Sequence, residues 1–268
     1  MLKDITLGQF FPADSPIHRL DARIKIVLSI AFMFTVFFVG NIAGYISLAL
    51  FVGTIILIST IPFKYILKGV KPLIFFIIFT ALLNMFLTGG NVIWQLGFIK
   101  ITDEGIKYAV FMSLRIIFLV IGTSMLTYTT SPIELTDGME SLLRPVSKFG
   151  IPVHEIAMMM SIALRFIPTL IEETDKIMKA QIARGIDFES GNIIKRAKAL
   201  IPILVPLFIS AFRRADDLAI AMECRCYHGG ENRTKLREPK LTKADFLASL
   251  IFLIFIIAII VLNIVFKG

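Results

Sequence analysis

Residues 247–266 read LASLIFLIFIIAIIVLNIVF, twenty consecutive residues without a charged side chain. About twenty apolar residues in a helix cross the roughly 30 Å hydrocarbon layer of a bilayer, where backbone groups must pair within the segment. Four further apolar runs precede this one, at residues 26–40, 45–61, 73–87 and 106–130. Charged residues make up 18% of the 268-residue chain, whereas a soluble domain carries about 25%. The sequence therefore predicts an all-α polytopic membrane protein with about five transmembrane helices.

The predicted spans divide the chain into three parts. Residues 1–130 hold an N-terminal segment and the first four spans, residues 131–243 form a long polar segment, and residues 244–268 hold the last span. Basic residues precede the first span and fill the loop between the second and third: Lys3, Arg19, Arg23, Lys25, Lys64, Lys68 and Lys71. The next loop has only Lys100. Because cytoplasmic loops are enriched in Lys and Arg, we expect the N-terminus and residues 131–243 to be cytoplasmic.

Three helices are predicted in the polar segment. The sequence SPIE at residues 131–134 is a capping box with proline at the first helical position, so the first helix runs to about residue 148. The second covers about residues 152–184 and the third about residues 192–227. Prolines lie inside the last two helices, and the one in the second helix should kink it: Pro168, Pro202 and Pro206.

Two stretches of these helices are apolar, around Met158, Met159 and Met160 and at residues 199–212. Fourteen uncharged residues are short for a span and suit a buried or interfacial helix. Their flanks are rich in charge, so we place them on the cytoplasmic side. A pair of extra spans here would leave the outer topology unchanged.

The charge of residues 131–243 is mixed. The segment has 17 Lys and Arg against 14 Asp and Glu. Mixed charge is typical of a protein-facing surface with ion pairs and argues against a nucleic-acid partner.

No motif for catalysis is recognisable. The chain lacks a phosphate-binding loop, a Gly-x-Ser-x-Gly turn and acidic residues inside the predicted spans. Cys224 and Cys226 with His228 would be half of a metal site without a second half. We therefore predict no catalytic residue, no metal site and no cofactor bound by this chain.

Arg115 is a charged residue inside an otherwise apolar span. Such a charge normally faces protein or water. The simpler interpretation is a structural arginine held by a carbonyl of a neighbouring helix, and the alternative is a role in transport.

Two similar triplets end the two long helices. They are Ala183-Arg184-Gly185 and Cys224-Arg225-Cys226. Small neighbours leave the guanidinium accessible to carboxylates or carbonyls of a partner. An arginine in a last helical turn also complements the helix dipole, and Gly185 is an ordinary helix stop. The occurrence of two such triplets favours a paired docking device. The methionines at 158–160 are either core or a conformable contact face.

A series of motifs follows in order along the chain: HRLDARIK at 18–25, TSPIEL at 130–135, PVHEIA at 152–157, ALRFIP at 163–168, AQIARG at 180–185, RRADDLA at 213–219 and AME at 221–223. Through this series, nearly the whole chain resembles the T component of energy-coupling factor (ECF) transporters.

This resemblance implies a non-catalytic scaffold in a prokaryotic cell membrane, with a cytoplasmic coupling module containing two long crossing helices. Their tips, with Arg184 and Arg225, would dock on two ABC-type ATPases, which bind ATP and Mg. A membrane-embedded substrate-binding S component for a vitamin or metal ion would contact the membrane-facing side, where we place Met158 to Met160. The family commonly has Ala-Arg-Gly at both tips. Since the second triplet lacks glycine, we expect Gly229-Gly230 to stop that helix instead.

A different class of function stays open. The chain could be a self-contained secondary transporter or channel, with residues 131–243 as a cytoplasmic regulatory segment. Uptake by the chain alone would distinguish this alternative from a scaffold.

Overall fold

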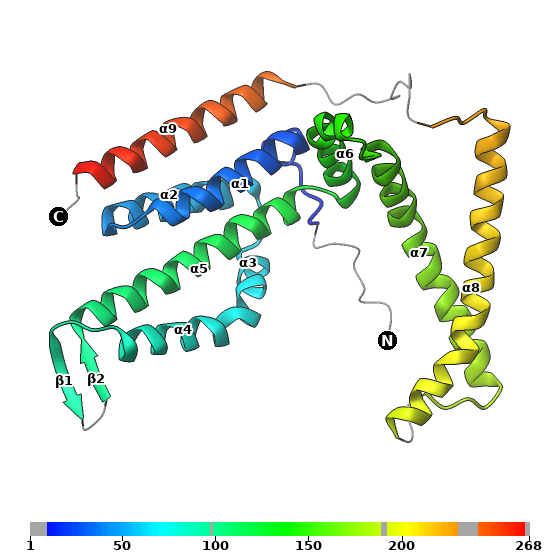
Figure 1. Ribbon diagram of the computed structural model, residues 1–268, viewed down its shortest axis with the longest axis horizontal. Coiled ribbons are helices and arrows are strands. Elements are labelled where there is room, and N and C mark those ends of the chain that lie inside the picture. The colour runs from blue at the N-terminus through cyan, green and yellow to red at the C-terminus, as the bar shows by residue number, and fades with distance from the viewer. Residues whose placement is uncertain (1–9, 97–98, 189–191, 230–240, 266–268) are drawn as a thin grey trace. The chain divides into compact units, whose positions relative to one another are not determined.

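The computed structural model describes residues 10–96, 99–188, 192–229 and 241–265. They form two compact units (Figure 1). The membrane unit comprises the described residues up to Met139 together with those from residue 241 onward. The α7–α8 unit comprises the described residues between Glu140 and residue 229. Helices dominate both units, which confirms the predicted all-α membrane fold.

The membrane unit contains most of the predicted spans. Its helices are α1 (Ala22–Phe38), α2 (Ile42–Ser59), α3 (Phe63–Val70), the 3₁₀ turn η1 (Lys71–Leu73), α4 (Ile74–Leu87), α5 (Asp103–Thr129) and α9 (Lys243–Val265). Helices α2, α5 and α9 and the continuous run Phe63–Leu87 are long and apolar enough to cross a membrane. With 17 residues, α1 is at the lower limit of a span.

One predicted loop is helical. The basic stretch after α2 was expected to be a loop, but α3 continues through η1 into α4. Pro72 lies in the first positions of η1. Proline is tolerated there because the backbone N–H groups of a first helical turn have no intrahelical acceptor. The span predicted at residues 73–87 is therefore the end of a 25-residue helical run.

A short hairpin, absent from the sequence prediction, joins α4 to α5. Strand β1 (Val92–Leu96) pairs antiparallel with β2 (Ile99–Thr102), with Leu96 opposite Ile99. Thr102 then caps α5, since its Oγ1 accepts the N–H of Gly105 at 3.1 Å and donates to Thr88 O at 2.8 Å.

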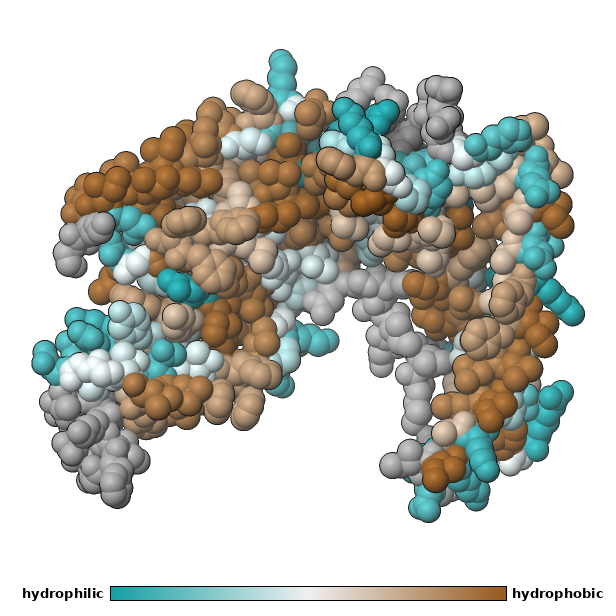
Figure 2. All heavy atoms as spheres, in the orientation of Figure 1, coloured by the Kyte–Doolittle hydropathy of each residue, from teal (hydrophilic) through white to brown (hydrophobic). Residues whose placement is uncertain are grey.

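The core of the membrane unit lies among α1, α2, α5 and α9. Its buried side chains are Phe32, Val36, Val39, Tyr45, Leu48, Val52, Phe118, Phe252 and Ile259. The ring of Phe32 packs on Gly122, where a Cβ would lie 2.3 Å from the ring. Many other apolar side chains face outward, and Figure 2 shows them in brown over these helices. Exposed apolar faces are what lipid-solvated helices require.

Helix α6 (Pro132–Leu143) follows α5 along the chain and begins with the predicted capping box. Glu134 N–H donates to Ser131 Oγ, and Ser131 N–H donates to a carboxylate oxygen of Glu134, both at 3.3 Å. The helix tightens into the 3₁₀ helix η2 (Arg144–Phe149) near Pro145 and ends at Gly150, whose φ is +83°. The predicted capping box and helix stop are confirmed.

The α7–α8 unit is built from two long helices, α7 (Val153–Ala183) and α8 (Ile193–Cys224). Their bounds agree closely with the predicted 152–184 and 192–227. Pro168 lies inside α7, and Pro202 and Pro206 lie inside α8, which visibly bends along its length (Figure 1). Helix α7 is also long and apolar enough to cross a membrane, although the sequence placed it on the cytoplasmic side.

Candidate functional site

The tip of α7 ends in a complete Schellman motif centred on Arg184. Arg184 is the C-cap, and Gly185 follows it with φ +87°. Gly185 N–H donates to Ile182 O at 2.9 Å, and Ile186 N–H donates to Gln181 O at 3.1 Å. These two bonds satisfy carbonyls that the last helical turn leaves unpaired.

The tip of α8 has the same motif around Arg225. Cys226 N–H donates to Glu223 O at 2.8 Å, and Tyr227 N–H donates to Met222 O at 3.0 Å. Cys226 takes the left-handed conformation with φ +56° that glycine takes at the first tip. The expectation that Gly229-Gly230 stops this helix is therefore wrong: the cysteine adopts the strained position itself, and the helix ends at Cys224.

Both triplets are exposed over all three residues, so each guanidinium stands at an open helix end. Cys224 and Cys226 are free thiols. Across the described part of the chain, no group of three or more His, Cys, Asp or Glu side chains is placed to hold a metal ion.

Two polar contacts fix the pairing of α7 with α8. Arg214 donates to a carboxylate oxygen of Glu173 at 2.7 Å. Gln181, which is buried, donates to Pro202 O at 3.2 Å. The later residue of α7, Gln181, contacts the earlier residue of α8, Pro202, and the earlier residue of α7, Glu173, contacts the later one, Arg214. The two helices therefore run antiparallel.

The two arginines are placed symmetrically about the Glu173–Arg214 bridge. Arg184 lies eleven residues beyond Glu173, and Arg225 lies eleven residues beyond Arg214. At 1.5 Å per residue each tip is about 16 Å from the bridge. Because the helices are antiparallel, the tips lie at opposite ends of the pair, as Figure 1 shows. The helical rise puts them about 30 Å apart.

A broad apolar stripe runs along α8 and is exposed. It consists of Leu200, Ile201, Leu204, Val205, Phe208, Ile209 and Phe212, which are between 46% and 68% exposed. The spacing of three and four residues puts them on one side of the helix. On α7, Met159 and Met160 are 58% and 41% exposed, and Met158 is half-buried. Exposed apolar surface of this extent is typical of a lipid or protein contact.

Arg115 lies in the membrane unit. Its guanidinium donates to Val39 O, at the end of α1, at 3.1 Å and stands 5.7 Å from the centre of the Phe37 ring. The carbonyl of a neighbouring helix is the kind of partner that the structural interpretation requires. Cation–π contact with the ring adds a second stabilising interaction.

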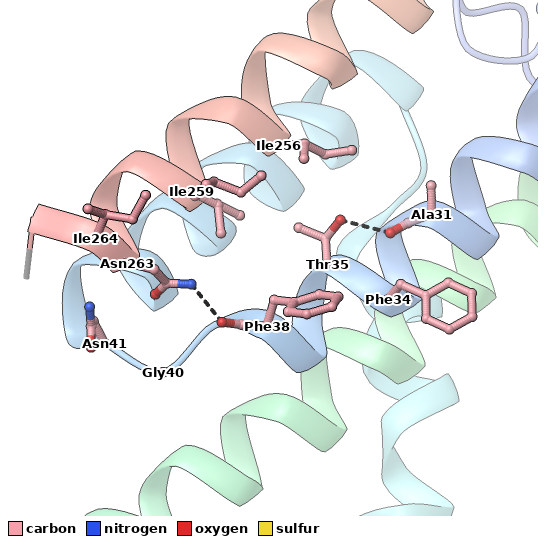
Figure 3. A pocket seen from close by; sticks show the side chains of 11 residues that line it. Ala31, Phe34, Thr35, Phe38, Gly40, Asn41, Ile256, Ile259, Asn263 and Ile264 are labelled. Atoms are coloured by element: carbon pink, nitrogen blue, oxygen red, sulfur yellow. Dashed lines mark hydrogen bonds between the residues drawn. The ribbon is translucent and has the colours of Figure 1, made fainter. Parts of the chain in front are cut away.

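A cleft of about 760 Å³ opens between α1 and α9 (Figure 3). Its walls are phenylalanine and isoleucine side chains, including Phe34 and Ile260. At one end Asn263 donates to Phe38 O at 2.6 Å and Asn41 donates to Leu262 O at 3.4 Å, so both amides tie the helix ends together. None of the residues that line this cleft is ionisable, so it offers no carboxylate to a cation or proton.

Sequence reasoning missed three parts of this site: the Glu173–Arg214 bridge, the buried Gln181 contact and the extent of the α8 stripe. The first two depend on how the helices pack, and no local pattern signals them. The stripe was visible as the uncharged residues 199–212, which were expected to be buried or interfacial.

Comparison with known proteins places the chain in a family. It matches the cobalt transport protein family CbiQ over residues 13–236. Three similar proteins are each named energy-coupling factor transporter transmembrane protein EcfT. The one from Clostridium kluyveri is 58% identical over 258 residues, covering 96% of both chains. Those from Thermosediminibacter oceani and Bacillus subtilis are 56% and 50% identical, covering 92% and 91% of this chain and 93% of each relative. The chain therefore belongs to the CbiQ family, the family of transmembrane components of energy-coupling factor transporters.

Proposed function

We propose that this chain is the non-catalytic coupling component of an ECF transporter. It transmits the ATP-driven motion of two ABC-type ATPases to a membrane-embedded S component that captures a vitamin or a metal ion. ATP and Mg belong to the ATPases. The names of the relatives support this proposal.

The observation that carries the proposal is the pair of identical arginine caps at opposite ends of one antiparallel helix pair. Arg184 and Arg225 are both exposed and share the same hydrogen-bonded turn. Two equivalent tips about 30 Å apart suit two equivalent partners. Arginine offers five N–H donors to carboxylates or carbonyls of a groove, and the exposed turn leaves them accessible.

The S component is assigned to the exposed apolar side chains of the α7–α8 unit. The stripe on α8 and the methionines at 158–160 supply large, conformable contact area. Methionine adapts to different partner shapes, which suits a surface that accepts more than one S component. The basic residues around the first spans support a cytoplasmic N-terminus.

Charge reversal at the tips tests the docking role. Arg184→Glu with Arg225→Glu should abolish co-purification of the ATPases and uptake into vesicles, while each single change should weaken docking at one tip. Arg213→Glu is the matched control, because Arg213 is an exposed arginine of α8 away from the tip. Wild-type ATPase binding by the double variant would refute the docking role. Uptake by the purified chain without ATPases would favour the self-contained transporter instead.

A further inference from the structure

The first turn of α1 contacts the end of α5, shortly before α6 carries the chain toward the α7–α8 unit. Lys25 is buried, with 6% of its surface exposed. Its ammonium donates to Thr129 O at 2.8 Å and to His18 O at 2.9 Å. Thr129 is the last residue of α5, and the α6 capping box begins two residues later at Ser131. A cation at the carboxyl end of α5 also complements the helix dipole.

The same turn contacts the chain where it returns. Asp245, in the first turn of α9, is 2% exposed. One of its carboxylate oxygens accepts the N–H of Asp21, the N-cap of α1, at 2.8 Å. The other accepts both the N–H and the hydroxyl of Thr242 at 2.7 Å. One buried carboxylate thus caps α9 and holds the start of α1.

A third contact joins this turn to α6. A Cβ placed on Gly138 would lie 3.0 Å from Ala22 Cβ and 3.2 Å from Ile26 Cδ1. This approach is close enough that glycine is needed for α6 to lie against α1 without displacement. The middle of α6 is therefore packed on the same turn that binds Thr129 and Asp245.

These contacts resist deformation because they use buried charges. A buried ammonium or carboxylate that loses its partners keeps its desolvation penalty without compensation. The end of α5 and the start of α9 are therefore each held to α1 by a buried charge whose hydrogen bonds are unfavourable to break, and α6 is held by close packing at Gly138.

We propose that residues 21–25 form a coupling anchor, through which force on the α7–α8 unit reaches the membrane-spanning helices. This inference rests on the proposed function. Helix α6 carries the chain out of the membrane unit at Met139–Glu140, and residues 241–242 are the first described residues after the chain returns to it. The anchor contacts α6 at Gly138, and it binds Thr129, just before α6, and, through Asp245, Thr242. Lys25 and Asp245 are positioning residues, because they are buried and fix the backbone near Thr129 and Thr242. Docking on the ATPases is the role of the helix tips at Arg184 and Arg225.

The test measures uptake per ATP hydrolysed by the full complex, reconstituted in vesicles with its ATPases and S component. Lys25→Met should lower this ratio about tenfold, a typical size for a lost coupling between sites, while ATP hydrolysis stays close to wild type. Lys25→Arg, which keeps a cationic donor, should restore most of the ratio. Arg115→Met is the matched control, because Arg115 is another cation that donates to a carbonyl, Val39 O, but at the other end of α1. Its ratio should not change.

A steric variant keeps the test independent of the buried charge. Gly138→Ala should push α6 from Ala22 and lower uptake per ATP, and adding Ala22→Gly should restore it. If the Lys25→Met protein is not produced in folded form, the Gly138→Ala variant and the Gly138→Ala/Ala22→Gly double variant test the coupling anchor instead.

The coupling anchor is refuted if uptake per ATP hydrolysed in the Lys25→Met and Gly138→Ala variants equals that of the wild type, including the case in which uptake and hydrolysis fall together. Failure of the proposed function looks different, since then the wild-type chain itself would not bind the ATPases.

Discussion

The bridge between Glu173 and Arg214 is predicted to hold the crossing of α7 and α8. The two side chains meet at 2.7 Å and are 23% and 37% exposed, so the pair lies between a surface ion pair and a buried one. A fully exposed pair contributes less than about 1 kcal/mol, and a hydrogen bond to a charged group about 1.5–3 kcal/mol. Partial exposure places the bridge near 1 kcal/mol, or about a fivefold change in the population of the paired state.

The perturbation is Arg214→Met, which keeps an unbranched side chain and removes the charge. Spin labels at positions 183 and 221, in a Cys224→Ser/Cys226→Gly background, report the distance between the ends of the helix pair. The labels lie ten and seven residues from the bridge, so the wild-type distribution should be narrow and centred at about 26 Å from the 1.5 Å helical rise. Arg214→Met should broaden it, because the populations of less tightly paired states rise.

Two controls make this prediction specific. Arg213→Met changes the exposed neighbouring arginine and should leave the distribution narrow. Exchanging the charges with Glu173→Arg and Arg214→Glu should restore the narrow distribution, since the pair can form in the opposite sense. A narrow distribution in Arg214→Met, or no recovery on exchange, would refute the bridge as the element that fixes the crossing.

Three further predictions concern local structure. Ser131→Ala should lower the stability of the start of α6 by about 1 kcal/mol, seen as a lower melting temperature in detergent, and an unchanged value would contradict the cap. Cys226→Gly should stabilise the tip of α8 by up to about 1 kcal/mol, and Gly185→Ala should destabilise the tip of α7 by a similar amount, because both positions have positive φ. Hydrogen exchange of the amides in the last helical turns measures both effects. Equal exchange rates in the wild type and both variants would exclude backbone strain as the cause. The side-chain hydrogen bond from Arg23 lowers the pKa of Asp21. The contribution of Asp21 to stability is therefore present above about pH 4 and is lost as pH falls through the lowered pKa. Asp21→Asn should reduce the fall of the melting temperature at acid pH, and the same fall in variant and wild type would show that Asp21 does not contribute.

Much of the site followed from local sequence. The capping box at Ser131 and the ends of α7 and α8 were predicted within a few residues, since caps, prolines and glycines act over one helical turn. The second helix stop was predicted wrongly. A cysteine has no intrinsic preference for the left-handed region, and only the bonds from Cys226 and Tyr227 to the last turn show that it is held there.

The sequence by itself determined that the chain is a helical membrane protein and where two exposed arginines end two long helices. Transfer of apolar side chains into lipid is a property of each segment, so long uncharged runs report it directly. Tertiary structure decided which distant residues meet. Asp245 accepts a bond from Asp21, 224 positions earlier, and Glu173 pairs with Arg214, 41 positions later. Such pairs form only when helices pack at a particular register, and no local pattern of residues specifies that register.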